Sequence, residues 1–143
     1  MSGHEYTFGG LFTGTLSGIL LEEDYDTLAC SLEGCFYAVD WKENHVARMM
    51  GNQVGDTMNM LKQDVCGRKA LSVRFPFTYV HTLGSPKMIK LYNPADCGSG
   101  CSTSSPSPWW VFSVVAPGPG EIEDLKKPSC AESKGFLARL IGK

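Results

Sequence analysis

Hydrophobic residues recur at helical spacing between about residue 41 and residue 62. They are separated by four, four, four and three positions: Val46, Met50, Val54, Met58 and Leu61. Such spacing places all of them on one face of an α-helix. Asp40 followed by Glu43 resembles a capping box with Asp in place of Ser or Thr, which favours a helix start near Trp41. We therefore predict one principal amphipathic helix over residues 41–62.

The start of this helix has an alternative on the sequence alone. Phe36 and Val39 continue the hydrophobic face, so the helix can also begin at Cys35, although Glu43 then interrupts the face. If the helix begins at residue 41 instead, residues 31–40 form a hairpin and Cys35 lies on a strand. The two starts give Cys35 very different surroundings.

The first 30 residues predict extended structure. Closely spaced glycines in residues 8–21 argue against a helix there and favour strands that approach one another closely. The acidic run at residues 22–24 predicts a solvated turn, and residues 27–32 predict a further short strand.

Strand patterns also dominate the second half of the chain. Turn-forming residues at positions 83–86 separate two of these runs and predict a hairpin. The predicted strands are Ala70–Phe75, Phe77–His81, Lys87–Tyr92 and Trp109–Val115. Together with the helix, they predict an α+β fold with an antiparallel sheet.

The length of 143 residues corresponds to about one domain. The run Pro117–Gly120 predicts the end of a compact domain over residues 1–120. Residues 121–143 are then a charged, flexible C-terminal tail with a short helix around residues 136–141.

Charge and hydropathy exclude some classes of partner. The chain has 13 basic and 15 acidic residues, a net charge of −2, and no basic run before its tail, which disfavours nucleic acid as a partner. The apolar runs are too short to span a bilayer, so no membrane partner is predicted. The first residues lack the basic and apolar regions of a signal peptide, and we predict a cytoplasmic location.

Six cysteines are many for a chain of this length. Without a signal peptide we expect them to stay reduced. Cys97 and Cys101 have a spacing that zinc tolerates, with Cys66, Cys130 or a histidine completing a tetrahedron. A second closely spaced ligand pair is missing, so structural thiols are the favoured interpretation and we predict no cofactor.

Three residues supply the parts of a cysteine hydrolase: Cys35, His81 and Asp96. A thiol at a helix N-terminus and close to an imidazole becomes a thiolate nucleophile. His81 ends a predicted strand, and Asp96 follows the return strand of the predicted hairpin. We expect the hairpin to place His81 and Asp96 at one rim.

This order of residues resembles the papain-like leader proteinases of RNA viruses. The resemblance runs from about residue 33 to residue 115 and includes the aromatic Phe36 directly after the cysteine. It implies that Cys35 is the nucleophile, that His81 is the general base, and that Asp96, or Asn93 as a substitute, orients the imidazole. It also implies a protein or peptide substrate, host cytoplasm as the location, and self-release at a C-terminus such as residues 140–143. Positions 27–34 contain no Gln or Asn whose side chain could donate a hydrogen bond to the oxyanion. The backbone N–H of Cys35 is therefore one oxyanion donor, and the second donor is unassigned.

Other interpretations remain open. Residues 94–98 resemble the Asp-Cys-Gly segment of chymotrypsin-like viral cysteine proteinases, but His45 lies inside the predicted helix, where that fold cannot place its histidine. Residues 75–115 also resemble the last third of a viral jelly roll, which implies a non-enzymatic interaction or capsid-like module. A small α+β scaffold that acts through partners, with or without zinc, is the third alternative. In the interaction module, an exposed indole of Trp109 or Trp110 would indicate a binding surface.

Overall fold

The computed structural model of this chain describes residues 7–67, 74–94 and 107–126. These residues form a six-stranded antiparallel sheet and helices, so the predicted α+β class is confirmed. The order of strands across the sheet is β1-β4-β5-β6-β2-β3. Among the described residues, no helix combines the length and apolarity that crossing a bilayer requires.

The strands include the hairpin predicted in the second half of the chain. Its two arms pair from Phe77 with Tyr92 to His81 with Met88. The predicted strand before residue 115 is also present, and it lies between the hairpin and the strands near residue 40. The bounds are β1 Ser17–Ile19, β2 Cys35–Asp40, β3 His45–Met50, β4 Phe77–His81, β5 Met88–Tyr92 and β6 Trp110–Ser113.

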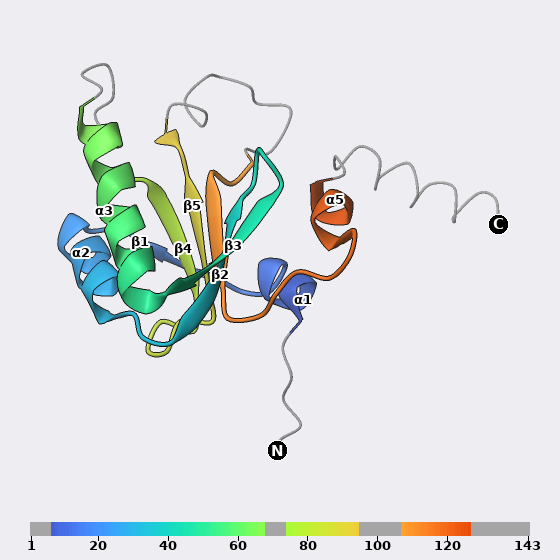
Figure 1. The fold of residues 1–143 in the computed structure, drawn as a ribbon. Helices are drawn as coiled ribbons and strands as arrows, with labels where there is room; N and C mark the ends of the chain where they lie inside the picture. The colour runs from blue at the N-terminus through green and yellow to red at the C-terminus, as the bar shows by residue number, and fades with distance from the viewer. Residues whose placement is uncertain (1–6, 68–73, 95–106, 127–143) are drawn as a thin grey trace, which may run out of the picture.

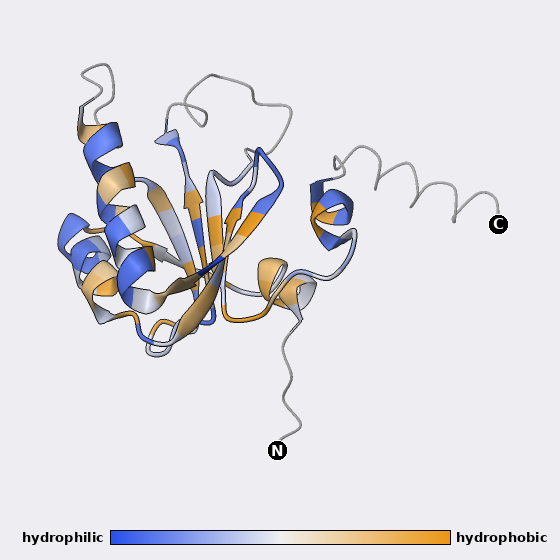
Figure 2. Ribbon diagram, viewed as in Figure 1, coloured by the Kyte–Doolittle hydropathy of each residue, from blue (hydrophilic) through white to orange (hydrophobic). Residues whose placement is uncertain are grey.

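Helices lie on both sides of the sheet (Figure 1). Two pack side by side on one face, and two shorter ones lie at the other side. Figure 2 shows hydrophobic residues in the strands and in α1, while the longest helix carries both hydrophilic and hydrophobic residues. The helix bounds are α1 Phe8–Phe12, α2 Glu22–Ser31, α3 Gly51–Cys66 and α5 Glu121–Lys126.

The principal helix begins ten residues later than predicted. Residues 41–50 form a turn and strand β3, and α3 runs from Gly51 to Cys66. The backbone N–H of Glu43 does donate to the Asp40 carboxylate at 3.3 Å, but this contact closes the β2–β3 turn. Asn44 in that turn has a φ of 58°, in the left-handed region, which ends any helical path. Both predicted helix starts are therefore wrong, and β2 begins at Cys35.

The N-terminal region is mostly helical, which contradicts its prediction as β-rich. Thr7 caps α1, because its hydroxyl accepts the Gly10 N–H at 2.9 Å. The acidic residues predicted as a turn form the first turn of α2, where their charge complements the helix dipole. Among the described residues of this region, which begin at residue 7, only the three residues of β1 form a strand.

The first core cluster lies between the sheet and helices α2 and α3. Tyr25 of α2 is fully buried, and its hydroxyl donates to the Met58 carbonyl of α3 at 2.6 Å. The two helices touch at Gly55, where an added Cβ would lie 2.2 Å from the Ala29 carbonyl oxygen. This close crossing fixes the position of α2 beside β1.

The second core cluster lies on the other face, between the sheet and helices α1 and α5. Phe8, Leu11 and Ile122 are buried there beside Trp41. The Glu121 carboxylate accepts the Gly9 N–H at 2.8 Å, so α5 is bonded to α1. The boundary predicted after residue 120 thus falls just before a helix that packs on the body. Residues 127–143, most of the predicted tail, lie outside the described residues, as do most of the predicted strand Ala70–Phe75 and most of the loop at 97–108.

Candidate functional site

Cys35 is the first residue of β2 and is paired with Met50 of β3. Its half-buried thiol is free and accepts a hydrogen bond from Arg48 Nη2 at 3.3 Å. The thiol therefore lies on a sheet and lacks the helix N-terminus that the sequence interpretation assigned to it. This corrects the physical basis proposed for its activation.

His81 ends β4, and the structure does not bring it to Cys35. One row of paired residues crosses the sheet from His81 through Met88 and Ser113 to Tyr37. β5 and β6 thus lie between the two strands, and three strand spacings amount to roughly 14 Å. An imidazole at that distance cannot take the thiol proton. The His81 Nδ1 atom instead lies 2.8 Å from the Thr82 hydroxyl.

The third predicted member, Asp96, lies outside the described residues, as do Cys97, Cys101 and Cys130. Asn93, its substitute, follows Tyr92, which pairs with Phe77. Asn93 is therefore at the opposite end of the hairpin from His81, about five residues or roughly 17 Å along the strands. Within residues 7–67, 74–94 and 107–126, no three His, Cys, Asp or Glu side chains form a group that suits a metal ion.

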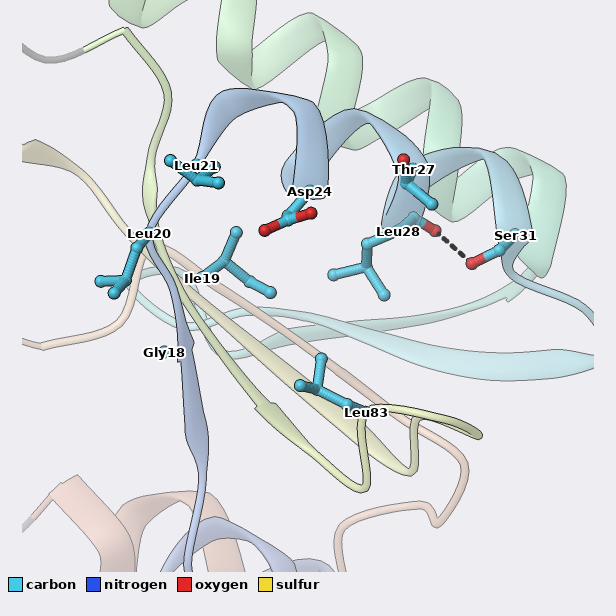
Figure 3. Close-up of a pocket in the computed structure, with 9 residues that line it drawn as sticks. All are labelled: Gly18, Ile19, Leu20, Leu21, Asp24, Thr27, Leu28, Ser31 and Leu83. Carbon is cyan, nitrogen blue, oxygen red and sulfur yellow. Dashed lines mark hydrogen bonds between the residues drawn. The ribbon is translucent and has the colours of Figure 1, made fainter.

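A groove beside α2 is a candidate site. It has a volume of about 600 Å³ and lies between α2, β1 and the β4–β5 turn. In Figure 3, Asp24, Leu28 and Leu83 point toward one hollow beside Ile19. The lining residues are Gly18, Ile19, Leu20, Leu21, Asp24, Thr27, Leu28, Ser31 and Leu83.

The walls of this groove are mainly apolar, and three of their leucines are exposed. Leu20 is 86% exposed, Leu21 54% and Leu83 51%. Leu28 belongs to the first core cluster, and the partly buried Ile19 packs against that cluster. The Ser31 hydroxyl donates to the Leu28 carbonyl at 3.0 Å, so it is already bonded within the helix. The side chains of the groove therefore offer mainly apolar surface.

Asp24 makes one end of the groove acidic, and Glu22, Glu23 and Asp26 line a separate hollow beside it. Lys62 bridges Glu22 and Asp26 at 2.7 Å each. These bonds, Asp26 first, raise the pKa of Lys62. In the part of the chain that the structure describes, the Glu23 and Asp24 carboxylates make no hydrogen bond and no ion pair. Within the described residues, the acidic end of the groove thus keeps the uncompensated charge of Asp24, and the hollow beside it keeps that of Glu23.

A buried amine lies on the other face of the sheet. Lys90 of β5 is 8% exposed, and its ammonium group donates to the carbonyl of Phe12, the last residue of α1, at 3.2 Å. The same group lies 3.8 Å from the centre of the Phe12 ring. Burial lowers the pKa of Lys90 to about 8. A cation that binds a carbonyl at the C-terminus of a helix stabilises that helix end. We therefore assign Lys90 a structural role.

Sequence interpretation missed every residue of the groove. The signal was present, since Asp24, Leu28 and Ser31 recur at four and three positions, which is one helical face. No protein-family profile, curated protein sequence or solved structure matches this chain.

Proposed function

We propose that this chain is a non-enzymatic protein-interaction module. Its ligand is an extended segment of a partner protein with apolar side chains next to a Lys or Arg, and it binds in the groove between β1 and α2. The observation that carries the proposal is the combination of exposed leucines with the unpaired Asp24 carboxylate in one hollow. Its volume is within the usual range of ligand sites.

The apolar part of the ligand follows from the leucines. Leu20, Leu21 and Leu83 come from two segments that are distant in the sequence and expose their side chains around one groove. Contiguous exposed apolar surface of this kind is typical of interaction sites. A partner side chain that removes this surface from water gains about 25 cal/mol for each Å² buried.

The basic part of the ligand follows from charge complementarity. Lys62 compensates Glu22 and Asp26 on the α3 side of the helix, while Glu23 and Asp24 have no cation partner within the part of the chain that the structure describes. A Lys or Arg of the ligand placed beside Asp24 would meet a carboxylate without a competing cation. Such pairs favour the correct register and accelerate association more than they add affinity.

The test is a selection of random dodecapeptides displayed on phage, with the full chain immobilised as bait. We expect enrichment of peptides with apolar residues beside Lys or Arg. For the strongest binder, made as a synthetic peptide, Leu83→Ser and Asp24→Asn should each weaken affinity about tenfold in calorimetry, equivalent to about 1.4 kcal/mol.

Two control variants match these changes outside the groove. Met60→Ser removes an exposed apolar side chain of α3, and Asp56→Asn removes an exposed carboxylate of the same helix. Both should bind the peptide as the wild type does. Equal affinity of Leu83→Ser and wild type, or enrichment of acidic peptides, would contradict the proposal.

A further inference from the structure

We infer that the ligand segment binds by strand addition, as an antiparallel strand on the free edge of β1. This inference rests on the proposed function and specifies how that site recognises its ligand. β1 is the end strand of the described sheet and pairs only with β4. Among the described residues, the backbone of Ser17–Ile19 makes no hydrogen bond beyond that ladder. An end strand of this kind is a template for an added strand.

The groove follows the edge of β1. Gly18 and Ile19 both line it, although consecutive residues of a strand face opposite sides of a sheet. Because Gly18 has no side chain, the hollow meets the backbone of β1 at this residue, and both Ser17 and Gly18 are exposed. The main-chain groups on this edge are therefore accessible to a segment lying in the groove.

The two sides of an added strand would meet different surroundings. Ile19 packs against the first core cluster, on the side of α2. Gly18 faces the other side, where an added Cβ would lie 3.4 Å from the ring of Tyr79, itself 42% exposed. Alternate side chains of the ligand would thus enter the apolar groove, while the others lie over Gly18 beside the Tyr79 ring.

The acidic end of the groove determines the direction in which the ligand strand runs. β1 runs toward Leu21 and the acidic end of the groove, and every described pair in this sheet is antiparallel. A strand added in the same way runs away from Asp24. Its Lys or Arg therefore lies N-terminal to its apolar residues, which are recognised at alternate positions by Leu28 and Leu83.

The experiment is a backbone N-methyl scan of the synthetic dodecapeptide selected above, with affinity measured by calorimetry on the full chain. N-methylation removes a donor and blocks strand pairing without changing the side chain. We expect losses of tenfold or more at every second position of the central segment and little change at the positions between them. Exchange of β1 amide hydrogens should slow on binding, while exchange in the opposite end strand, β3, stays unchanged.

The outcomes separate the two proposals. If the peptide depends on Leu83 and Asp24 but losses are uniform or recur every three to four positions, strand addition is overturned while the groove remains the site. If no peptide depends on the groove, the proposed function itself fails. If the wild type forms a dimer in sedimentation that Leu83→Ser abolishes and the peptide does not dissociate, the occupant is a second copy, which overturns the inferred partner.

Discussion

At the scale of single residues, the buried Lys90 makes the stability of the fold depend on pH. The pKa of Lys90 is about 8 in the folded chain, compared with its ordinary value of 10.5. The pKa is lowered because burial disfavours the charged amine. The unfolded chain therefore holds the proton more tightly than the folded chain. The contribution of Lys90 to stability is complete only above pH 10.5 and is lost as the pH falls through 8.

Lys90→Met should remove this pH dependence. Between about pH 7 and about pH 9.5, the free energy of unfolding of the wild type should rise by roughly 1 to 2 kcal/mol more than that of the variant. Urea denaturation at both pH values measures the difference. Parallel curves for the two proteins would show that Lys90 is not the group responsible.

The predicted hydrolase depends on a contact between Cys35 and His81 that the register of the sheet does not provide. Alkylation of Cys35 by limiting iodoacetamide between about pH 5 and about pH 9 should therefore be unaffected by His81→Ala. Peptide mass spectrometry gives the rate for each cysteine, with Cys66, exposed at the end of α3, as the internal control. Selective reactivity of Cys35 at low pH that His81→Ala abolishes would restore the proteinase hypothesis.

At the scale of elements, periodicity located the interior of α3 and failed at its start. Val54, Met58 and Leu61 are buried as predicted, whereas Val46 and Met50 are exposed on β3. A spacing of four suits a helix face and also one face of a strand, since four is a multiple of two. The Asp40–Glu43 contact occurs in helix caps and in turns alike, so neither signal distinguishes a hairpin from a helix start.

Contact between α2 and α3 depends on Gly55. Gly55→Ala would place a methyl group against the Ala29 carbonyl, so the helices must separate. We expect a net loss of roughly 1 to 3 kcal/mol in the free energy of unfolding despite the better helix propensity of alanine. Gly84→Ala is the control, because nothing lies within 4 Å of its Cβ. Equal denaturation midpoints for the two variants would contradict this close crossing.

At the scale of the whole molecule, the sheet order decides which residues meet. β6 follows a long segment yet lies between β5 and β2, so it separates the hairpin with His81 from the strand with Cys35. All described strands belong to one sheet, whereas a jelly roll packs two sheets together. Trp109 and Trp110 are both partly buried against the first core cluster, so neither marks a freely exposed surface.

The two ends of the described chain pack together through α1 and α5. Ile122→Ser should weaken this contact by roughly 2 kcal/mol, because a buried apolar side chain is lost. Hydrogen exchange should accelerate in α1 and α5 and remain unchanged in α3. Met60→Ser serves as the control, since Met60 is exposed on α3. Faster exchange throughout the chain would instead indicate global destabilisation.

The sequence by itself determined the α+β class, the β4–β5 hairpin, strand β6 and the buried face of α3, because local periodicity and turn residues encode these features. Only the tertiary structure decided that Cys35 and His81 are separated and that Asp24 and Leu83 share a groove. These facts depend on the order of strands and on close helix crossings such as that at Gly55. Pairing between segments that are distant in the chain produces no periodic pattern in the amino-acid sequence.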